Sequence, residues 1–287
     1  MTAVGERAVP AHAKVNLWLH VTGRLANGYH SLDSLHVRTS LADRLWFTPA
    51  DSPALEVTGR FSAALQDLDG SRNLVTRALA AVAPTQAFRI VLEKNIPVAS
   101  GLGGGSADAA ATLRTVSGLT EDLPAIAATL GADVPSCLHD GTVMTAGTGD
   151  VVTPVEPLPE CALVLVNPGT ALPTAKVFAG FEEPLSVPRP LTRPPESFDD
   201  LVRELANRRN DLEPAACRVE PGISDVLSAL RTTPGIALAR MTGTGATCFG
   251  LAGTLRQADR AAALLRRHHP GWWIEATIIL TQPRAGP

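Results

Sequence analysis

A glycine-rich loop at residues 97–107 has the residue types that bind anionic groups. It reads Pro-Val-Ala-Ser-Gly-Leu-Gly-Gly-Gly-Ser-Ala, so that four glycines fall within five residues. Glycine reaches backbone angles that other residues rarely adopt, and successive N–H groups can then turn to one side as a nest for an anion. Ser106 is predicted to cap a helix whose free N–H groups and dipole favour negative charge. The pattern predicts a polyphosphate ligand.

The loop matches neither of two familiar phosphate-binding patterns. A Walker A sequence needs a lysine after its last glycine, whereas Ser106 follows Gly105 directly. The dinucleotide fingerprint follows its strand at once, whereas residues 93–97 separate this loop from the strand predicted at 88–92. A flexible linker is the remaining alternative, but the apolar, helix-forming flanks argue against it. A third type of ATP-phosphate loop fits best.

Lys14 and Asp133 are charged residues in apolar surroundings. Lys14 interrupts a strand pattern, and Asp133 lies in Gly-Ala-Asp-Val-Pro, just after the end of a predicted helix. Each would compensate the charge of the other if the two were buried together. A carboxylate beside an ammonium can accept the proton of a hydroxyl while the ammonium stabilises phosphate charge, as phosphoryl transfer to an alcohol requires. A structural ion pair is the alternative, and the sequence leaves both open.

Gly28-Tyr29-His30 contains the only tyrosine of the chain, beside a histidine at a predicted turn. Such a pair can stack on a planar ring and hydrogen-bond its edge. The alternative is a hairpin with Tyr29 in the core.

The composition limits the class of protein. The 287 residues carry a net charge of −3, which gives no electrostatic reason to expect nucleic acid or an anionic membrane as a partner. The four cysteines are scattered, without metal-ligand spacing, and no apolar run is long enough to span a bilayer. We therefore expect a soluble, cytoplasmic protein. The sequence leaves both a monomer and a homodimer open.

Strands and helices alternate in both halves of the chain, which predicts an α+β protein of two domains. The composition shift at 153–160 suggests a boundary, with domains at 1–155 and 156–287. A proline-rich excursion is predicted at 184–195. Strands are predicted at 13–22, 32–47 with an interruption at 41–43, 55–58, 88–92, 141–146, 162–166, 236–240, 247–251 and 272–277. Helices are predicted at 73–83, 106–116, 123–130, 198–206, 223–230 and 255–267, and a turn at Asn27–Gly28.

Together these clusters resemble the superfamily of small-molecule kinases that includes galactokinase, homoserine kinase, mevalonate kinase and phosphomevalonate kinase, the GHMP kinases. Within it, five segments match in order the 4-diphosphocytidyl-2-C-methyl-D-erythritol kinase family. They are Ala-Lys-Val-Asn-Leu at 13–17, Gly-Tyr-His-x-Leu at 28–32, Lys-Asn-Ile-Pro at 94–97, the segment at 131–135, and Leu-Pro-Thr at 172–174. Two departures are Asn27, where Asp is usual, and Ala107-Asp108, where Ser-Asn is also seen.

The resemblance implies an N-terminal domain like the second domain of ribosomal protein S5 and a ferredoxin-like C-terminal domain, with the active-site cleft between them. It implies ATP and Mg²⁺ as cofactors, with no side chain assigned to the metal, and direct in-line phosphorylation of the 2-hydroxyl of 4-diphosphocytidyl-2-C-methyl-D-erythritol. Asp133 would be the base and Lys14 its charged partner. The implied ATP-binding residues are Asn73, Lys94, Pro97, Val98, Ala99, Ser100, Gly101, Leu102, Gly103, Gly104, Gly105, Ser106 and Ala107. The implied substrate-binding residues are Asn16, Tyr29, His30, Thr174, Phe178, Thr242 and Gly243, with Tyr29 and Phe178 on the two faces of the cytosine ring.

Three rival functions stay open at this point. Another kinase of the superfamily would act on an alcohol without a nucleobase, for which an aromatic clamp at Tyr29 would have no purpose. A regulatory protein could have kept the loop and lost catalysis, although the presence of both Lys14 and Asp133 speaks against it. The third rival is a dinucleotide-dependent oxidoreductase.

Overall fold

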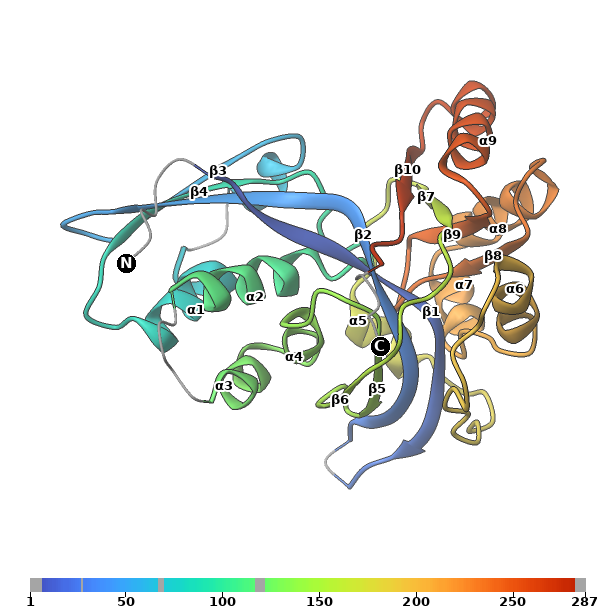
Figure 1. The fold of residues 1–287 in the computed structure, drawn as a ribbon, viewed down its shortest axis with the longest axis horizontal. Coiled ribbons are helices and arrows are strands. Elements are labelled where there is room, and N and C mark those ends of the chain that lie inside the picture. The colour runs from blue at the N-terminus through green and yellow to red at the C-terminus, as the bar shows by residue number, and fades with distance from the viewer. Residues whose placement is uncertain (1–6, 27, 67–69, 117–121, 282–287) are drawn as a thin grey trace. The chain divides into compact units, whose positions relative to one another are not determined.

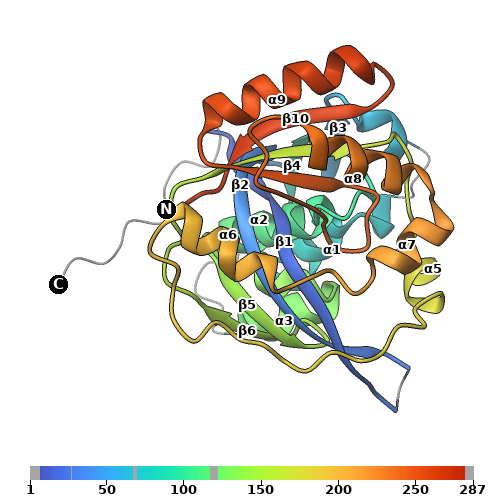
Figure 2. The same ribbon diagram turned by 90° about the vertical axis from the view of Figure 1, so that its right-hand side faces the viewer.

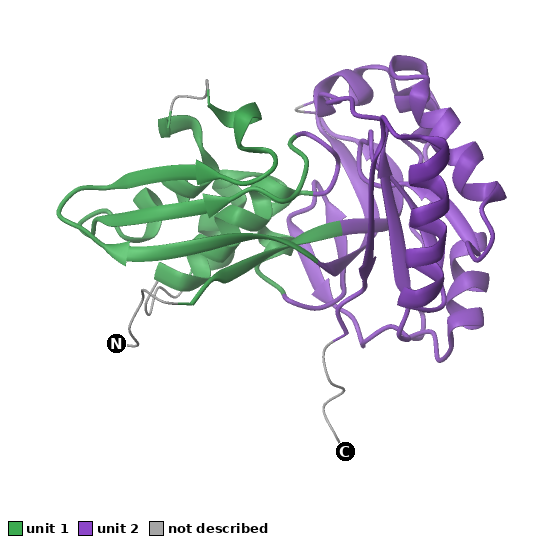
Figure 3. Ribbon diagram, turned by 90° about the horizontal axis from the view of Figure 1, so that it is seen from above, with its two compact units in different colours: residues 1–14, 41–98, 103–139 green, residues 15–40, 99–102, 140–287 purple. Residues whose placement is uncertain are grey.

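The structure is a computed structural model that describes residues 7–26, 28–66, 70–116 and 122–281. The chain divides into two compact units, which Figure 3 distinguishes by colour. Unit 1 comprises residues 1–14, 41–98 and 103–139, and unit 2 comprises residues 15–40, 99–102 and 140–287. The units interleave along the sequence, so the division at residues 155 and 156 stays a prediction.

Two long strands contribute residues to both units. These strands are β1 (Val9–Arg24) and β2 (His30–Pro49). The interruption predicted at 41–43 is wrong, because β2 continues through it. Asp43, which lies in this stretch, is fully buried and accepts hydrogen bonds from the backbone N–H groups of Asn95 and Ile96. The strand can therefore run on without leaving the carboxylate unsatisfied.

Unit 1 places helices against a short sheet. The second half of β2 pairs antiparallel with β4 (Phe88–Glu93), and β4 pairs parallel with β3 (Ala54–Thr58). The helices α1 (Leu74–Val82) and α2 (Gly104–Val116) run beside these strands in Figure 1. Short helices α3 (Leu123–Leu130) and α4 (Val134–Cys137) pack against α2, and two 3₁₀ turns, η1 (Ser62–Leu65) and η2 (Gly70–Arg72), precede α1.

The alanine-rich sequence of α2 explains its close packing. Ala107, Ala109, Ala110 and Ala111 are all buried, and small side chains let α1 and the sheet approach the helix. The helix begins at Gly104, two residues before the predicted cap at Ser106, and the N–H of Ala107 donates to the carbonyl of Gly103. Ser106 therefore lies within the first turn and is not the cap.

Unit 2 contains a four-stranded antiparallel sheet of order β10-β7-β9-β8. Its strands are β7 (Ala162–Asn167), β8 (Leu238–Met241), β9 (Cys248–Ala252) and β10 (Trp273–Ile278). The helices α8 (Gly222–Thr232) and α9 (Leu255–His268) pack on this sheet, as Figure 2 shows. The first half of β2 pairs with β5 (Val143–Gly147), which pairs with β6 (Val151–Pro154). The remaining helices are α5 (Thr174–Ala179), α6 (Phe198–Ala206) and α7 (Glu213–Val219).

The other predicted strands and helices are confirmed with shifts of one or two residues at their ends, except that β1 begins at Val9, four residues before the predicted start at residue 13. The sequence analysis missed β6, α4, α5 and α7, each of which has seven residues or fewer. Residues 184–195 form neither helix nor strand, as predicted. The turn at Asn27–Gly28 is described only at Gly28, which has a positive φ of 84°. Among the described residues, no helix has the length and hydropathy that a bilayer crossing requires.

Candidate active site

The glycine-rich loop has a backbone that alternates in handedness. Ala99, Gly101 and Gly103 have positive φ values of 52°, 80° and 65°. A left-handed residue at every second position turns the N–H groups between them toward one side, which is the geometry of an anion nest. The loop then enters α2, where the free N–H groups of the first turn add to this donor set. The backbone therefore suits a phosphate group.

Gly101 is fixed by a second glycine-containing loop of unit 2, at residues 242–246. A Cβ built on Gly101 would lie 2.6 Å from the carbonyl oxygen of Thr242 and 2.8 Å from that of Gly245, so no larger residue fits. The N–H of Thr247 also donates to the carbonyl of Ser100. Asn210 holds the second loop by donating to the carbonyls of Met241 and Gly243 at 2.9 and 2.8 Å. Residues 100 and 101 of the glycine-rich loop therefore pack directly against this second loop.

In unit 1, the structure brings Lys14 and Asp133 together. Lys14 Nζ lies 3.1 Å from Asp133 Oδ1, with the lysine side chain 4% exposed and the aspartate side chain 41% exposed. Gly103 packs on the stem of the lysine, since a Cβ there would lie 2.6 Å from Lys14 Cγ. A buried ammonium, a solvent-facing carboxylate and one residue of the glycine-rich loop therefore meet at one place.

The chain around Asp133 explains how its carboxylate reaches this place. α3 ends at Leu130 with Gly131 as its C-cap, and Asp133 precedes the single turn of α4. Its carbonyl accepts hydrogen bonds from the N–H of Cys137 and from Ser136 Oγ, which fixes its backbone. Its carboxylate makes no capping bond to α4 and instead lies against Lys14.

A second lysine of unit 1, Lys94, belongs to a buried cluster with Asp43 and Asp108. Its Nζ donates to Asp108 Oδ2 at 2.7 Å and also to Asp43 Oδ2. Burial tends to lower the pKa of Lys94, but the two carboxylates outweigh it and the pKa is raised. The ammonium therefore faces two carboxylates. The assignment of Lys94 and of Asn73, whose side chain caps α1 by accepting from the N–H of Val75, to an adenine pocket stays a prediction.

Aromatic rings gather near the β1–β2 turn of unit 2. The His30 ring stacks on Phe178 with centroids 5.1 Å apart and meets the edge of Phe181 at 5.7 Å. Burial, and secondly the charge of Arg24, lower the pKa of His30, which favours its neutral form. Tyr29 is 64% exposed, so the alternative that placed it in a hairpin core is wrong.

Other predicted substrate residues lie in polar contacts of unit 2. The backbone N–H of Asn16 donates to Thr242 Oγ1 and its Nδ2 donates to Ser34 Oγ, both at 2.8 Å. Thr174 Oγ1 lies 3.1 Å from Thr244 Oγ1. Asn16 and Thr242 are thus joined directly, from positions far apart in the sequence.

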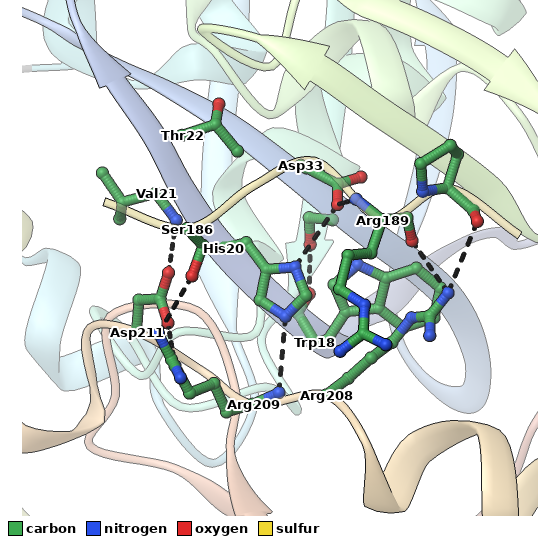
Figure 4. A network of polar contacts seen from close by, with 12 residues as sticks. Trp18, His20, Val21, Thr22, Asp33, Ser186, Arg189, Arg208, Arg209 and Asp211 are labelled. Atoms are coloured by element: carbon green, nitrogen blue, oxygen red, sulfur yellow. Dashed lines mark hydrogen bonds and ion pairs between the residues drawn. The ribbon is translucent and has the colours of Figure 1, made fainter. Parts of the chain in front are cut away.

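The sequence analysis missed a groove of about 520 Å³ in unit 2, lined by His20, Leu185, Ser186, Val187, Arg189, Ala206, Asn207, Arg208 and Arg209. Figure 4 shows the polar network beside it. His20 Nδ1 lies 3.3 Å from Asp33 Oδ2, and this oxygen also accepts from the N–H of Arg189 at 2.8 Å. Arg208 lies over the Trp18 ring at 4.2 Å and donates to the carbonyl of Arg189. The network anchors residues 184–195 to β1 and β2.

Asp43 and Asn210 were also missed. The sequence around Asp43 does contain a signal, because an acidic residue inside an apolar strand needs a partner for its charge. The sequence does not identify that partner. Asn210 lies in Arg-Arg-Asn-Asp, where nothing in the types of its neighbours marks it out.

Comparison with known proteins adds independent evidence. The family models for the N-terminal and C-terminal domains of GHMP kinases match residues 73–141 and 191–271. A 4-diphosphocytidyl-2-C-methyl-D-erythritol kinase of Rhodospirillum rubrum is 48% identical over 280 residues, covering 94% of this chain and 91% of the relative. The kinase of the same name from Parvibaculum lavamentivorans is 47% identical, covering 93% of this chain and 96% of the relative.

Solved structures agree with these relatives. A crystal structure of 4-(cytidine 5'-diphospho)-2C-methyl-D-erythritol kinase has a TM-score of 0.74 and 35% identity, covering 96% of this chain and all of the other. A mevalonate kinase of L. major has a TM-score of 0.68 but only 16% identity, covering 98% and 97% of the two chains, and so shares the fold. The expected two-domain α+β architecture is confirmed, and the oxidoreductase alternative is removed. The chain therefore belongs to the GHMP kinases, a family of ATP-dependent small-molecule phosphotransferases, and groups there with the 4-diphosphocytidyl-2-C-methyl-D-erythritol kinases.

Proposed function

We propose that this chain phosphorylates the 2-hydroxyl of 4-diphosphocytidyl-2-C-methyl-D-erythritol with ATP, in the non-mevalonate route to isoprenoid precursors. The substrate is the one named for relatives that are 48% and 47% identical over nearly the whole chain. The observation that carries the mechanism is the contact of 3.1 Å between Lys14 and Asp133, next to Gly103 of the glycine-rich loop.

Asp133 is proposed as the general base. Its carboxylate accepts the proton of the 2-hydroxyl as the hydroxyl oxygen bonds to the γ-phosphorus and the bond from that phosphorus to the bridging oxygen of ADP breaks. Lys14 pairs with the carboxylate and stabilises the negative charge of the transferring group. The unequal exposure of the pair supports these roles, because the base must reach a substrate and the ammonium need not.

Residues 97–107 are proposed to bind the ATP phosphates, mainly through backbone N–H groups. The positive φ values at Ala99, Gly101 and Gly103 support this role. Mg²⁺ is proposed to arrive with the nucleotide. Within the described ranges, no group of three His, Cys, Asp or Glu side chains forms a metal site, so phosphate oxygens would supply most of its ligands.

The cytidine part of the substrate is proposed to bind unit 2 residues. Tyr29 and Phe178 would cover the two faces of the cytosine ring, and His30, which stacks on Phe178, would contact its edge. Asn16, Thr174, Thr242 and Gly243 would contact the rest of the substrate. The high exposure of Tyr29 supports its role, because an exposed ring is available to a ligand.

A substrate panel tests the proposal. ADP release is measured with 4-diphosphocytidyl-2-C-methyl-D-erythritol, mevalonate and homoserine as acceptors. We expect turnover with the first compound and background rates with the other two. A faster rate with mevalonate or homoserine would assign the chain to another kinase of the family, and no turnover with any acceptor would favour the regulatory protein.

A further inference from the structure

Three buried charges join the two ends of the glycine-rich loop. Asp43, Lys94 and Asp108 all lie in unit 1 and are at most 2% exposed. Asp43 Oδ1 accepts from the N–H groups of Asn95 and Ile96, at 2.5 and 2.9 Å, where the chain leaves β4 for the loop. Asp108 lies in the second turn of α2, where the loop has ended. The Lys94 ammonium contacts both carboxylates, so a single cation links the entry of the loop to its exit.

The cluster holds one negative charge more than positive charge if both carboxylates are ionised. Asp108 Oδ1 has no hydrogen-bond partner and is buried, which is unfavourable for an ionised carboxylate. Burial raises the pKa of Asp108 to about 7, with the repulsion of Asp43 adding to the effect and the attraction of Lys94 opposing it. One proton on the carboxylate pair makes the cluster neutral.

The other charged groups packed around α2 do not neutralise the extra negative charge of the cluster. α3 has no charged residue, and α4 contains no charged side chain. Arg77 of α1 donates to the carbonyl of Thr129 at the surface, and Arg114 of α2 donates to that of Cys137. In the unit 1 parts of β1 to β4, the other charged or titratable groups are Lys14, which pairs with Asp133, Arg44 with Glu93, Arg89 with Glu56, and His12.

We propose that Asp108 is a positioning residue for the glycine-rich loop and takes up a proton when a nucleotide binds there. The phosphates bring several negative charges to the loop that the cluster supports. The negative charges of the phosphates disfavour the extra negative charge of the cluster. A proton on Asp108 removes that extra charge, and the contacts of Lys94 with both carboxylates remain. The inference rests on the proposed assignment of residues 97–107 to the ATP phosphates. It does not depend on which alcohol is phosphorylated.

Calorimetry measures this proton. The binding of a non-hydrolysable ATP analogue with Mg²⁺ is titrated at pH 7 in buffers of different ionisation enthalpy, for the unaltered protein and for Asp108→Asn. The asparagine amide has the shape of the protonated acid and cannot titrate. Any protonation of the analogue itself occurs with both proteins and cancels in the comparison. We expect the unaltered protein to take up more protons than the variant, by up to about half a proton. From pH 7 to pH 8 its affinity should fall by about two- to threefold more than that of the variant.

Asp51→Asn is the matched control, because it makes the same chemical change at an exposed position of unit 1. It should keep the proton uptake of the unaltered protein. A merely structural Asp108 would alter affinity or stability but would leave the proton count unchanged. Equal proton counts for the unaltered protein and Asp108→Asn therefore overturn the inference, whatever the substrate panel gives.

A measurement without variants covers the case in which Asp108→Asn does not fold. The infrared difference spectrum of the unaltered protein, with and without the analogue, should gain the band of a protonated carboxyl group. Absence of that band with the analogue bound contradicts the inference. Inactivity toward 4-diphosphocytidyl-2-C-methyl-D-erythritol would contradict the proposed function alone, so the two failures can be told apart.

Discussion

At the residue scale, the Lys14–Asp133 pair combines one buried and one solvent-facing charge. The lysine side chain is 4% exposed, so its ammonium is held by the surrounding residues. The aspartate side chain is 41% exposed, so its carboxylate stays accessible. Asp133→Asn should lower turnover by about 10²- to 10⁴-fold, because an amide cannot accept the hydroxyl proton. The affinity for an ATP analogue should change little. Steady-state kinetics and calorimetry of the same preparation check both statements.

Asp51→Asn again serves as the control, since it removes an exposed carboxylate of the same unit and should leave turnover unchanged. Near-normal turnover of Asp133→Asn would leave the pair as a structural ion pair, the alternative that the sequence left open.

The exposure of Tyr29 makes a second prediction at this scale. Tyr29→Ala should weaken the binding of 4-diphosphocytidyl-2-C-methyl-D-erythritol by about 1–3 kcal/mol, the contribution of one stacked base, and Phe178→Ala should weaken it further. Thermal stability should be kept by Tyr29→Ala, because the ring is 64% exposed. Leu25→Ala removes another exposed side chain near the same turn and should not affect affinity. Unchanged affinity of the Tyr29→Ala, Phe178→Ala double variant would refute the sandwich.

At the scale of the element, the glycine-rich loop depends on two glycines that no larger residue can replace. Gly103→Ala places a methyl group 2.6 Å from Lys14 Cγ at a φ of +65°, so the loop or the lysine must move. We expect a loss of stability of about 1–3 kcal/mol and a larger relative loss of turnover than of stability. Gly70→Ala, in open space without a positive φ, is the control. Thermal unfolding and kinetics make the comparison, and a Gly103→Ala protein with normal turnover would contradict it.

The segment at 184–195 makes an element-scale prediction about pH. Burial tends to raise the pKa of Asp33, but hydrogen bonds from His20 and from the N–H of Arg189, with the charges of His20 and Arg208, outweigh it and lower the pKa below 3.8. The stabilisation is therefore present above pH 3.8 and is lost as the pH falls through the lower folded value. Asp33→Asn should cost about 1–3 kcal/mol at pH 6, and the difference should shrink toward pH 3. Urea unfolding across this range tests it, and a difference independent of pH would be evidence against an ionised Asp33.

The elements themselves were largely predictable, since α1, α3, α6 and α9 were predicted to within one residue at each end, whereas β1 begins four residues before its predicted start. The pairing of Lys14 with Asp133 was also predictable, because two charges in apolar surroundings each need a partner. The partners of Lys94 were not, because nothing local joins it to Asp43, 51 positions away. The break predicted in β2 at 41–43 was wrong, and the long-range hydrogen bonds that satisfy Asp43 inside the strand could not be predicted from the local sequence either.

At the scale of the whole molecule, each unit has an apolar core of its own. The core of unit 1 forms around α1, α2 and the strands β2 and β4, and that of unit 2 forms around α8, α9 and the four-stranded sheet. Leu113 of α2 and Leu230 of α8 are fully buried members of the two cores. Truncating a buried leucine to alanine costs about 2–5 kcal/mol, and local opening follows the stability of the surrounding core.

Leu113→Ala should therefore lower the hydrogen-exchange protection of amides in α1 and α2 more than that of amides in β7 and β9. Leu230→Ala should give the opposite pattern. Exchange measured by mass spectrometry under native conditions compares the two, and each variant is the matched control of the other, because both lose the same atoms from a fully buried site. If both variants lower protection equally throughout the chain, the two cores open as one cooperative structure, and the separation of the cores has no consequence for local stability.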